Sequence, residues 1–351
     1  MNFASDNAAG VAPEILAALS RVNVGGALAY GRDDWTKRAE RRFAEIYERE
    51  VAVFLVPTGT AANALALAHL TPPWGAVLCH DEAHIATDEC GAPEFFGGGI
   101  KLIGLQGEGG KIAPEMLERR LKSGQWGGPH HVSPAVVSLS QATEAGTIYR
   151  VEEIRRLAEV AHHHGVAVHV DGARLSNALA RMNASPADAT WRAGVDVLSF
   201  GATKGGALAA EAVMFFDPAR AAGMAERRKR GGQLISKHRF IAAQFEAFFA
   251  NDLWLTLARH ANAMADRLAE RLSSAGIVPL WPVEANEVFV VLSARTDRRL
   301  KASGAIYYPW TAHALPGGRT LAADEMVVRL VTSFATIPDE VDRFAAAARS
   351  G

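Results

Sequence analysis

The stretch "VHVDGARLSNA" (residues 168–178) places charged side chains at the end of an apolar strand. Valines alternate with His169 and Asp171, Gly172 interrupts the run, and Arg174 opens an expected helix. In a parallel α/β sheet, ligands bind at the carboxyl ends of the strands. Asp171 and Arg174 are therefore candidate site residues, and the rest of the chain indicates what they serve.

The composition is that of an ordinary globular enzyme. The chain has 351 residues, of which 49% are apolar and 21% charged, with a formal net charge of −1. This balance argues against nucleic acid or a membrane surface as a partner. Cys79 and Cys90 lack metal-ligand spacing and suggest a reducing compartment. The first ten residues have no secretory pattern, and polar residues interrupt the most apolar window (51–70), so we expect a soluble cytoplasmic protein.

Short apolar runs alternate with helical stretches from about residue 50. The expected strands are 51–56, 76–80, 100–105, 135–140, 166–170 and 195–200, and a helix over 150–165 ends at Gly165. This order predicts a mainly parallel sheet covered on both faces. After residue 250 the pattern becomes a long helix (254–276), strands at 287–293 and 326–333, and a last helix. We therefore expect a large domain over 1–250, with an N-terminal arm over 1–14, and a small α+β domain over 251–351.

The loop "PTGTAAN" (57–63) joins the first strand to a helix. If Thr60 caps that helix, the first free N–H groups form an anion site suited to one phosphate. An ordinary capped helix is the alternative. The loop is not a P-loop, and the nearest match, "GLQGEGGKI" (104–112), has Leu105 and Ile112 where the motif needs Gly and Ser or Thr.

Lys204 follows an apolar strand in "SFGATKGG" (199–206). A lysine in an apolar pocket loses its charge readily and becomes a nucleophile toward aldehydes, although a lysine extended toward solvent at a strand end is the alternative. Asp171 ends a strand 33 residues earlier, about one strand–helix–strand unit away. A phosphate loop, a carboxylate and a lysine together indicate a site for pyridoxal phosphate, with the lysine forming the Schiff base and the aspartate keeping the pyridine nitrogen protonated.

Several motifs then carry a resemblance over essentially the whole chain, from "FASDNAAG" (3–10) to the last helix. They are "FLVPTGTAAN" (54–63), "AHIATDECGAPEFFGG" (83–98), "QATEAGTIY" (141–149), "VHVDGARLSNA", "SFGATKGG", "GGQLISKHRF" (231–240) and "VVRLVTSF" (327–334). With these motifs the chain resembles the low-specificity L-threonine aldolase and phenylserine aldolase family of fold-type I pyridoxal-phosphate enzymes. The resemblance implies a large domain with a mainly parallel seven-stranded sheet, a smaller C-terminal α+β domain, and a homotetramer with shared active sites.

The resemblance also assigns residues. Lys204 would be the Schiff-base lysine, Asp171 would pair with the pyridine nitrogen, and His84 would stack on the ring and serve as acid or base. The phosphate would be bound by Thr58, Gly59 and Thr60, with Lys237 from the same or a neighbouring subunit. Ser5, Tyr30, Arg174 and Arg329 would hold the substrate, with Arg174 facing its carboxylate or the phosphate. Some family members have a second histidine where this chain has Glu144, so His84, Glu144 and a water held by Asp88 are all open as the base.

The implied activity is cleavage of L-β-hydroxy-α-amino acids, such as L-threonine, L-allo-threonine or L-phenylserine, to glycine and an aldehyde. A β-eliminating lyase, an aminotransferase or a non-catalytic scaffold of the same fold are the alternatives. A nicotinamide enzyme is disfavoured because no GxGxxG follows the first strand. We expect no metal site, since "HHH" (162–164) suits an exposed helix end. We expect "ERRKR" (226–230) to be a solvated face or a subunit contact.

Overall fold

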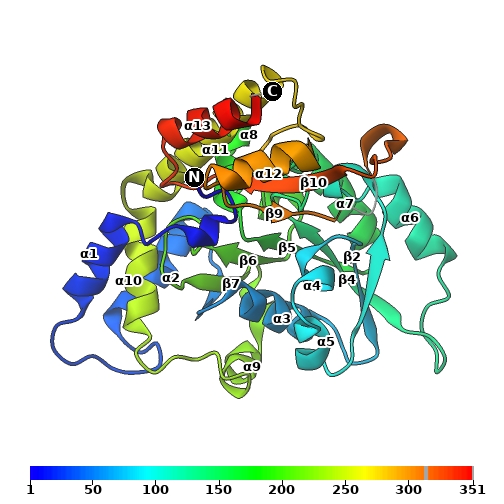
Figure 1. The fold of residues 1–351 in the computed structure, drawn as a ribbon. Helices are drawn as coiled ribbons and strands as arrows, with labels where there is room; N and C mark the ends of the chain where they lie inside the picture. Colours follow the sequence, from blue (N-terminus) through cyan, green and yellow to red (C-terminus); the bar gives the residue numbers. More distant parts are fainter. Residues whose placement is uncertain (312–314, 350–351) are drawn as a thin grey trace.

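A seven-stranded sheet forms the centre of the computed structural model, which describes residues 1–311 and 315–349 (Figure 1). Its order is β1-β7-β6-β5-β4-β2-β3, and only β7 is antiparallel to its neighbours. The strands are β1 (Ala52–Val56), β2 (Gly75–His80), β3 (Lys101–Leu105), β4 (Ser133–Ser140), β5 (Ala167–Gly172), β6 (Val197–Gly201) and β7 (Glu211–Phe215). The predicted mainly parallel seven-stranded sheet is confirmed. The strand missing from the sequence prediction is β7, which begins with a charged residue directly after the small residues Ala209 and Ala210.

Both faces of the sheet are covered, as the apolar runs predict. Alternate residues of β6 belong to different cores: Val197 packs with α3 (Gly59–Leu70), whereas Leu198 packs with α7 (Val151–His163) and α10 (Arg239–Phe249). The same alternation sends His169 and Asp171 toward one face and Val168 and Val170 toward the other. Asp171 is therefore on the α3 side.

The other helices of the large domain complete these two layers. They are α1 (Pro13–Val22), α2 (Asp34–Ile46), α4 (His84–Thr87), α5 (Ala92–Phe96), α6 (Pro114–Ser123), α8 (Leu175–Met182) and α9 (Met224–Arg230). Among the helices over residues 1–311 and 315–349, none combines the length and apolar content needed to cross a bilayer.

The smaller C-terminal domain contains an antiparallel sheet of order β8-β10-β9. Its elements are α11 (Leu253–Ser273), β8 (Glu287–Ser293), α12 (Ala294–Ala302), β9 (Tyr308–Pro309), β10 (Glu325–Val331) and α13 (Pro338–Arg349). The N-terminal arm joins this domain. The Phe3 N–H donates to the Ile306 carbonyl oxygen, and the Phe3 carbonyl oxygen accepts the Val331 N–H. The Phe3 ring packs edge-on against Phe344, with the ring centres 5.0 Å apart. The start of the chain is thereby held beside α12 and α13 (Figure 1).

The two cores meet along α11. Trp254 near its start packs into the core under the large sheet, and Ala265, Leu268 and Leu272 pack against β8 and β10. One helix thus contributes to both cores, and the domain boundary at residues 250/251 stays a prediction.

Candidate active site

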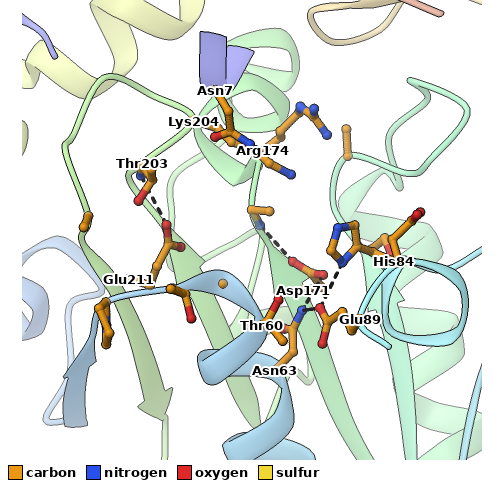
Figure 2. A pocket seen from close by; sticks show the side chains of 18 of the residues that line it. Asn7, Thr60, Asn63, His84, Glu89, Asp171, Arg174, Thr203, Lys204 and Glu211 are labelled. Carbon is orange, nitrogen blue, oxygen red and sulfur yellow. Dashed lines mark hydrogen bonds and ion pairs between the residues drawn. The ribbon is translucent and has the colours of Figure 1, made fainter. Parts of the chain in front are cut away.

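A cavity of about 510 Å³ opens at the carboxyl edge of the large sheet (Figure 2). Among the residues of the sequence prediction, those that line it are Thr58, Gly59, Thr60, His84, Asp88, Glu144, Asp171, Arg174 and Lys204. Asn7, Pro57, Asn63, Glu89, Ser140, Ala142, Ala173, Thr203, Leu208, Ala209 and Glu211 complete the lining. Strand ends scattered over the sequence therefore converge as the fold class requires.

Helix α3 begins on the cavity wall. Its N-cap is Thr58, whose extended backbone lets Oγ1 accept the Ala61 N–H at 3.1 Å. The prediction that Thr60 caps this helix is wrong, because Thr60 already lies inside the first turn. The first-turn N–H groups of Gly59 and Thr60 have no carbonyl partner within the helix, so they remain available to an anion.

Asp171 is held at the end of β5 with its carboxylate toward the cavity. Oδ2 accepts from Nδ2 of Asn63 on α3 at 2.8 Å, and Oδ1 accepts the Ala173 N–H at 3.0 Å. Gly172 must follow it, because a Cβ there would lie 2.8 Å from Leu198 and 2.9 Å from the carbonyl oxygen of Ser199. The hydrogen bonds from Asn63 and Ala173 and the close packing at Gly172 therefore fix the orientation of the Asp171 carboxylate.

His84 faces the cavity across from Asp171 (Figure 2). Its Nδ1 lies 2.9 Å from Oε1 of Glu89, a side chain with no exposed surface, and Asn63 donates to the same oxygen at 2.9 Å. Burial lowers the pKa of His84, but the hydrogen bond to Glu89 and the charges of Glu144 and Asp171 outweigh it, so the pKa is raised. Asn63 therefore links Asp171 to the Glu89–His84 pair, because its amide group donates to both carboxylates.

The ligand atoms of His84, Glu89 and Asp171 lie within 4.8 Å of one another. One imidazole and two carboxylates at this spacing resemble a metal ligand set. Here the Asn63 amide donates to both carboxylates and Nδ1 of His84 is bound to Glu89, so hydrogen bonds account for the grouping. The expectation of no metal site stays a prediction.

Lys204 is half-buried in the loop after β6. Its neighbour Thr203 is fixed at both ends: the Thr203 N–H donates to Oε1 of Glu211 at 3.3 Å, and its Oγ1 accepts the Ala210 N–H at 3.2 Å. The loop is therefore closed onto the start of β7, which places the lysine at the cavity.

Arg174 is buried, and Asp6 of the N-terminal arm binds it. Nε and Nη2 of Arg174 donate to the Asp6 carboxylate at 2.8 and 3.2 Å, and Nη2 also lies 3.3 Å from Glu287. Arg329 lies 3.8 Å from the same Glu287 carboxylate, and its guanidinium is 4.6 Å from the centre of the Trp310 ring. Glu287 thus lies between the two arginines that were predicted to hold the substrate carboxylate.

Glu144 lines the cavity near this group. Burial raises the pKa of the Glu144 carboxyl, partly against the positive influence of His84, and the Glu287 charge raises it further. A carboxyl group that protonates readily therefore faces the same cavity as His84.

Four predicted residues are outside the cavity lining: Ser5, Tyr30, Lys237 and Arg329. The Ser5 hydroxyl accepts the Asn7 N–H at 3.1 Å, and Asn7, not Ser5, lines the cavity. Lys237 and Tyr30 are exposed, and the Lys229 ammonium lies 4.8 Å from the Tyr30 ring. Within this one chain the structure does not bring these side chains to the cavity.

Asn63, Glu89 and Glu211 line the cavity, although they are not among the site residues predicted from the sequence. Asn63 lies one helical turn after Thr60, so it shares a helix face with that residue, and this spacing is a usable signal. Glu89 and Glu211 carry no comparable local signal, because their partners are 26 and 8 residues away in sequence.

The two remaining charged motifs lie away from the cavity. In the "HHH" segment, His162 pairs with Asp196 at 2.9 Å and His164 with Glu118 at 3.2 Å. The "ERRKR" segment forms part of α9, where Arg228 donates to the carbonyl oxygen of Leu55 at 3.1 Å. Their described contacts include ion pairs, hydrogen bonds and cation–ring contacts within the fold.

Comparison with known proteins adds independent information to this geometry. The sequence model of the beta-eliminating lyase family matches residues 2–295. The chain is 45% identical over 307 residues to a low specificity L-threonine aldolase of Pseudomonas aeruginosa, covering 87% of this chain and 88% of the relative. A low specificity L-threonine aldolase of another Pseudomonas strain is 41% identical with the same coverage. A solved Leishmania major threonine aldolase structure matches with a TM-score of 0.91 at 29% identity, over 99% of this chain and 98% of that one. The chain therefore belongs to the beta-eliminating lyase family, with the low-specificity L-threonine aldolases, and has the fold of fold-type I pyridoxal-phosphate enzymes.

Proposed function

We propose that this chain is a pyridoxal-phosphate-dependent aldehyde-lyase that cleaves L-β-hydroxy-α-amino acids, such as L-threonine, L-allo-threonine or L-phenylserine, to glycine and an aldehyde. The observation that carries the proposal is the convergence of Lys204, Asp171 and the first turn of α3 on one cavity. The two relatives that are 45% and 41% identical are both named low specificity L-threonine aldolase, which supports this reaction over the sister reactions of the fold.

The residues in the cavity fit the proposed cofactor by their chemistry. The Gly59 and Thr60 N–H groups suit a phosphate, the Asp171 carboxylate suits a protonated ring nitrogen, and the Lys204 amine suits an aldehyde. These three groups differ in what they attract, so one molecule with three matching functions accounts for all of them. When bound, pyridoxal phosphate supplies an electron sink for the Cα–Cβ bonding electrons of the substrate.

Asp171 is suited to hold a proton on a ring nitrogen because its two oxygens are fixed by Asn63 and Ala173. Its buried position at the end of β5 strengthens the electrostatic interaction. Lys204 provides the amine that links the cofactor to the chain, and the Thr203 contacts hold its loop against the cavity.

We assign removal of the β-hydroxyl proton to Nε2 of His84. Nδ1 is bound to the Glu89 carboxylate, so neutral His84 carries its proton on Nδ1 and presents a free lone pair on Nε2. Glu144 and a water at Asp88 are the other groups proposed for proton transfer, since both side chains line the same cavity. The raised pKa of Glu144 suits a group that gives a proton back.

We assign the substrate carboxylate to Arg174, which lines the cavity, and to Arg329, which lies outside the lining but contacts the same Glu287 carboxylate. Ser5 and Tyr30, which also lie outside the lining of this single chain, are proposed as further substrate residues. Arg174 gives two of its five N–H groups to Asp6, so three remain for other acceptors. A carboxylate held by two arginines turns the Cα–Cβ bond into the orientation needed for cleavage.

We also propose a homotetramer with shared sites in the cytoplasm. Lys237, Tyr30 and Leu28 are exposed, and Leu208, which lines the cavity, exposes 58% of its surface, which supports a covering subunit at that residue. Lys237 would then reach the phosphate of a neighbouring site. The free thiols Cys79 and Cys90 support a reducing compartment. Light scattering coupled to gel filtration tests the assembly, and a monomeric holoenzyme would contradict it.

The activity is tested by adding L-threonine and L-threo-phenylserine separately to the enzyme loaded with pyridoxal phosphate. Equal amounts of aldehyde and glycine are expected, with Lys204→Ala as the inactive control. A keto acid as the product would assign the chain to a sister reaction instead. Full aldehyde release by Lys204→Ala would overturn the proposed role of that lysine.

A further inference from the structure

Glu211 is a buried carboxyl group in the cavity wall that the reaction outlined above leaves without a role. It begins β7, which runs antiparallel to both β1 and β6. An antiparallel strand brings its first residue to the edge where its parallel neighbours end. Glu211 consequently pairs with Val56, just before the α3 loop, and with Gly201, just before the Lys204 loop.

The carboxyl group lies beside the first turn of α3. Glu211 is only 6% exposed, and its Oε2 is 3.9 Å from the position that a Cβ on Gly59 would occupy. Its Oε1 accepts the Thr203 N–H at 3.3 Å, which fixes the side chain toward the cavity (Figure 2). A phosphate bound by the Gly59 and Thr60 N–H groups would therefore be close to this carboxyl group.

The charges around Glu211 compensate one another only partly. Lys204 on the loop after β6 and Asp171 on β5 act on it electrostatically, while the α3 residues Gly59 to Asn63 and the β1 end at Val56 and Pro57 carry no charge. Burial raises the pKa of Glu211 to about 7, with Lys204 lowering it and Asp171 raising it. A nearby phosphate dianion would disfavour the ionised carboxylate further.

We propose that Glu211 takes up one proton when the phosphate group of the cofactor binds, and that the neutral acid then donates its O–H toward that phosphate. The proton comes from solvent and stays on the Glu211 carboxyl group while the cofactor is bound. The inference rests on the proposed cofactor, because it concerns the same cavity. It makes Glu211 a binding residue whose charge state sets cofactor affinity.

The sign of the pH dependence follows from the two states of Glu211. Well below pH 7 the carboxyl group is already mostly neutral before binding, so it takes up almost no proton. Above pH 7 the free form is ionised and must be protonated, so affinity falls by up to about tenfold per pH unit until the pKa of the bound form is reached. At pH 8 about nine-tenths of the free form is ionised, so uptake approaches one proton.

The test is titration calorimetry at pH 8, in phosphate-free buffers of different ionisation enthalpy, on the full chain stripped of cofactor. The slope of heat against buffer enthalpy gives the protons taken up per cofactor bound. Wild type should exceed Glu211→Gln by about 0.9 proton with pyridoxal phosphate, and the difference should fall to about 0.1 proton at pH 6. Glu40→Gln, which removes a carboxyl group of α2 outside the cavity lining, should keep the wild-type proton uptake.

Pyridoxal, which has the aldehyde and no phosphate, is the matched ligand. When pyridoxal binds, wild type and Glu211→Gln should take up the same number of protons, because no phosphate dianion then lies beside Glu211. Equal uptake by the two proteins with pyridoxal phosphate would overturn the inference. If the variant does not fold, the wild type alone decides: the same number of protons taken up with pyridoxal phosphate as with pyridoxal would overturn the inference. A wild type that binds no pyridoxal phosphate and stays colourless instead contradicts the proposed cofactor itself.

Discussion

Replacing Asp6 with alanine removes the partner of a buried arginine. The side chains of Arg174 and Asp6 are only 6% and 1% exposed, and two hydrogen bonds join them. Breaking a buried ion pair costs about 3–5 kcal/mol, and Glu287 at 3.3 Å from Nη2 offsets part of the loss, so we expect about 3 kcal/mol. A domain of about 250 residues loses about 2 °C in melting temperature per kcal/mol, so the expected fall is about 6 °C.

The assay is the melting temperature of the loaded enzyme by calorimetry at one scan rate, together with KM for L-threonine. KM should rise, because Asp6 also orients the arginine proposed to hold the substrate carboxylate. Asp188→Ala, which removes an exposed partner of Arg192, is the control and should leave both values unchanged. An Asp6→Ala enzyme that melts within 1 °C of wild type, with the same KM, would refute the reasoning.

The Asp6 contribution also has a pH dependence of defined sign. Burial raises the pKa of Asp6, but Arg174 and Lys204 outweigh it and lower the pKa below the ordinary value of 3.8. The stabilisation is therefore present above pH 3.8 and is lost as the pH falls through the lowered pKa. The difference between wild type and Asp6→Ala should accordingly shrink in acid.

Three further predictions concern cofactor binding and catalysis. Asp171→Asn should bind pyridoxal phosphate but lower kcat on the order of a hundredfold or more, the scale of losing one preorganised electrostatic group, and a wild-type kcat would contradict its role. Glu89→Gln removes a group that raises the pKa of His84, so the acid limb of kcat/KM should move to lower pH than in wild type; an unmoved limb would dissociate His84 from the hydroxyl proton. Lys237→Ala should weaken cofactor binding. In a tetramer mixed from Lys237→Ala and Lys204→Ala subunits, a complete site forms only if Lys237 of one subunit serves the Lys204 site of its neighbour, so activity should exceed that of either variant alone only in that case.

The sheet could be predicted from the sequence because its strands are continuous apolar runs. The runs at 51–56, 76–80 and 135–140 become β1, β2 and β4, of which β2 is buried throughout and β1 and β4 have buried and partly buried positions. The exception is β7, whose assignment depends on pairing with β1 and β6 and not on its own five residues. The cap of α3 was misplaced by two residues, because Thr58 and Thr60 are equally good capping residues and only the backbone conformation distinguishes them.

The site could be predicted where a residue ends a strand, and it could not where the partner is remote. Lys204, Asp171 and Gly59 follow apolar runs, so their convergence follows from the fold class. Asp6 gives no such sign, since it lies in the N-terminal arm 168 residues before the arginine it binds. Glu287 likewise meets Arg174 only because β8 of the small domain packs beside the cavity.

The central claim is that Lys204 binds the cofactor covalently. The most direct measurement is borohydride reduction of the enzyme loaded with pyridoxal phosphate, followed by proteolysis and mass mapping of the modified peptide. The account predicts one modified residue, Lys204, and no modification of Lys237 or Lys111. A modification on any other lysine, or none on a folded protein incubated with pyridoxal phosphate, would contradict it.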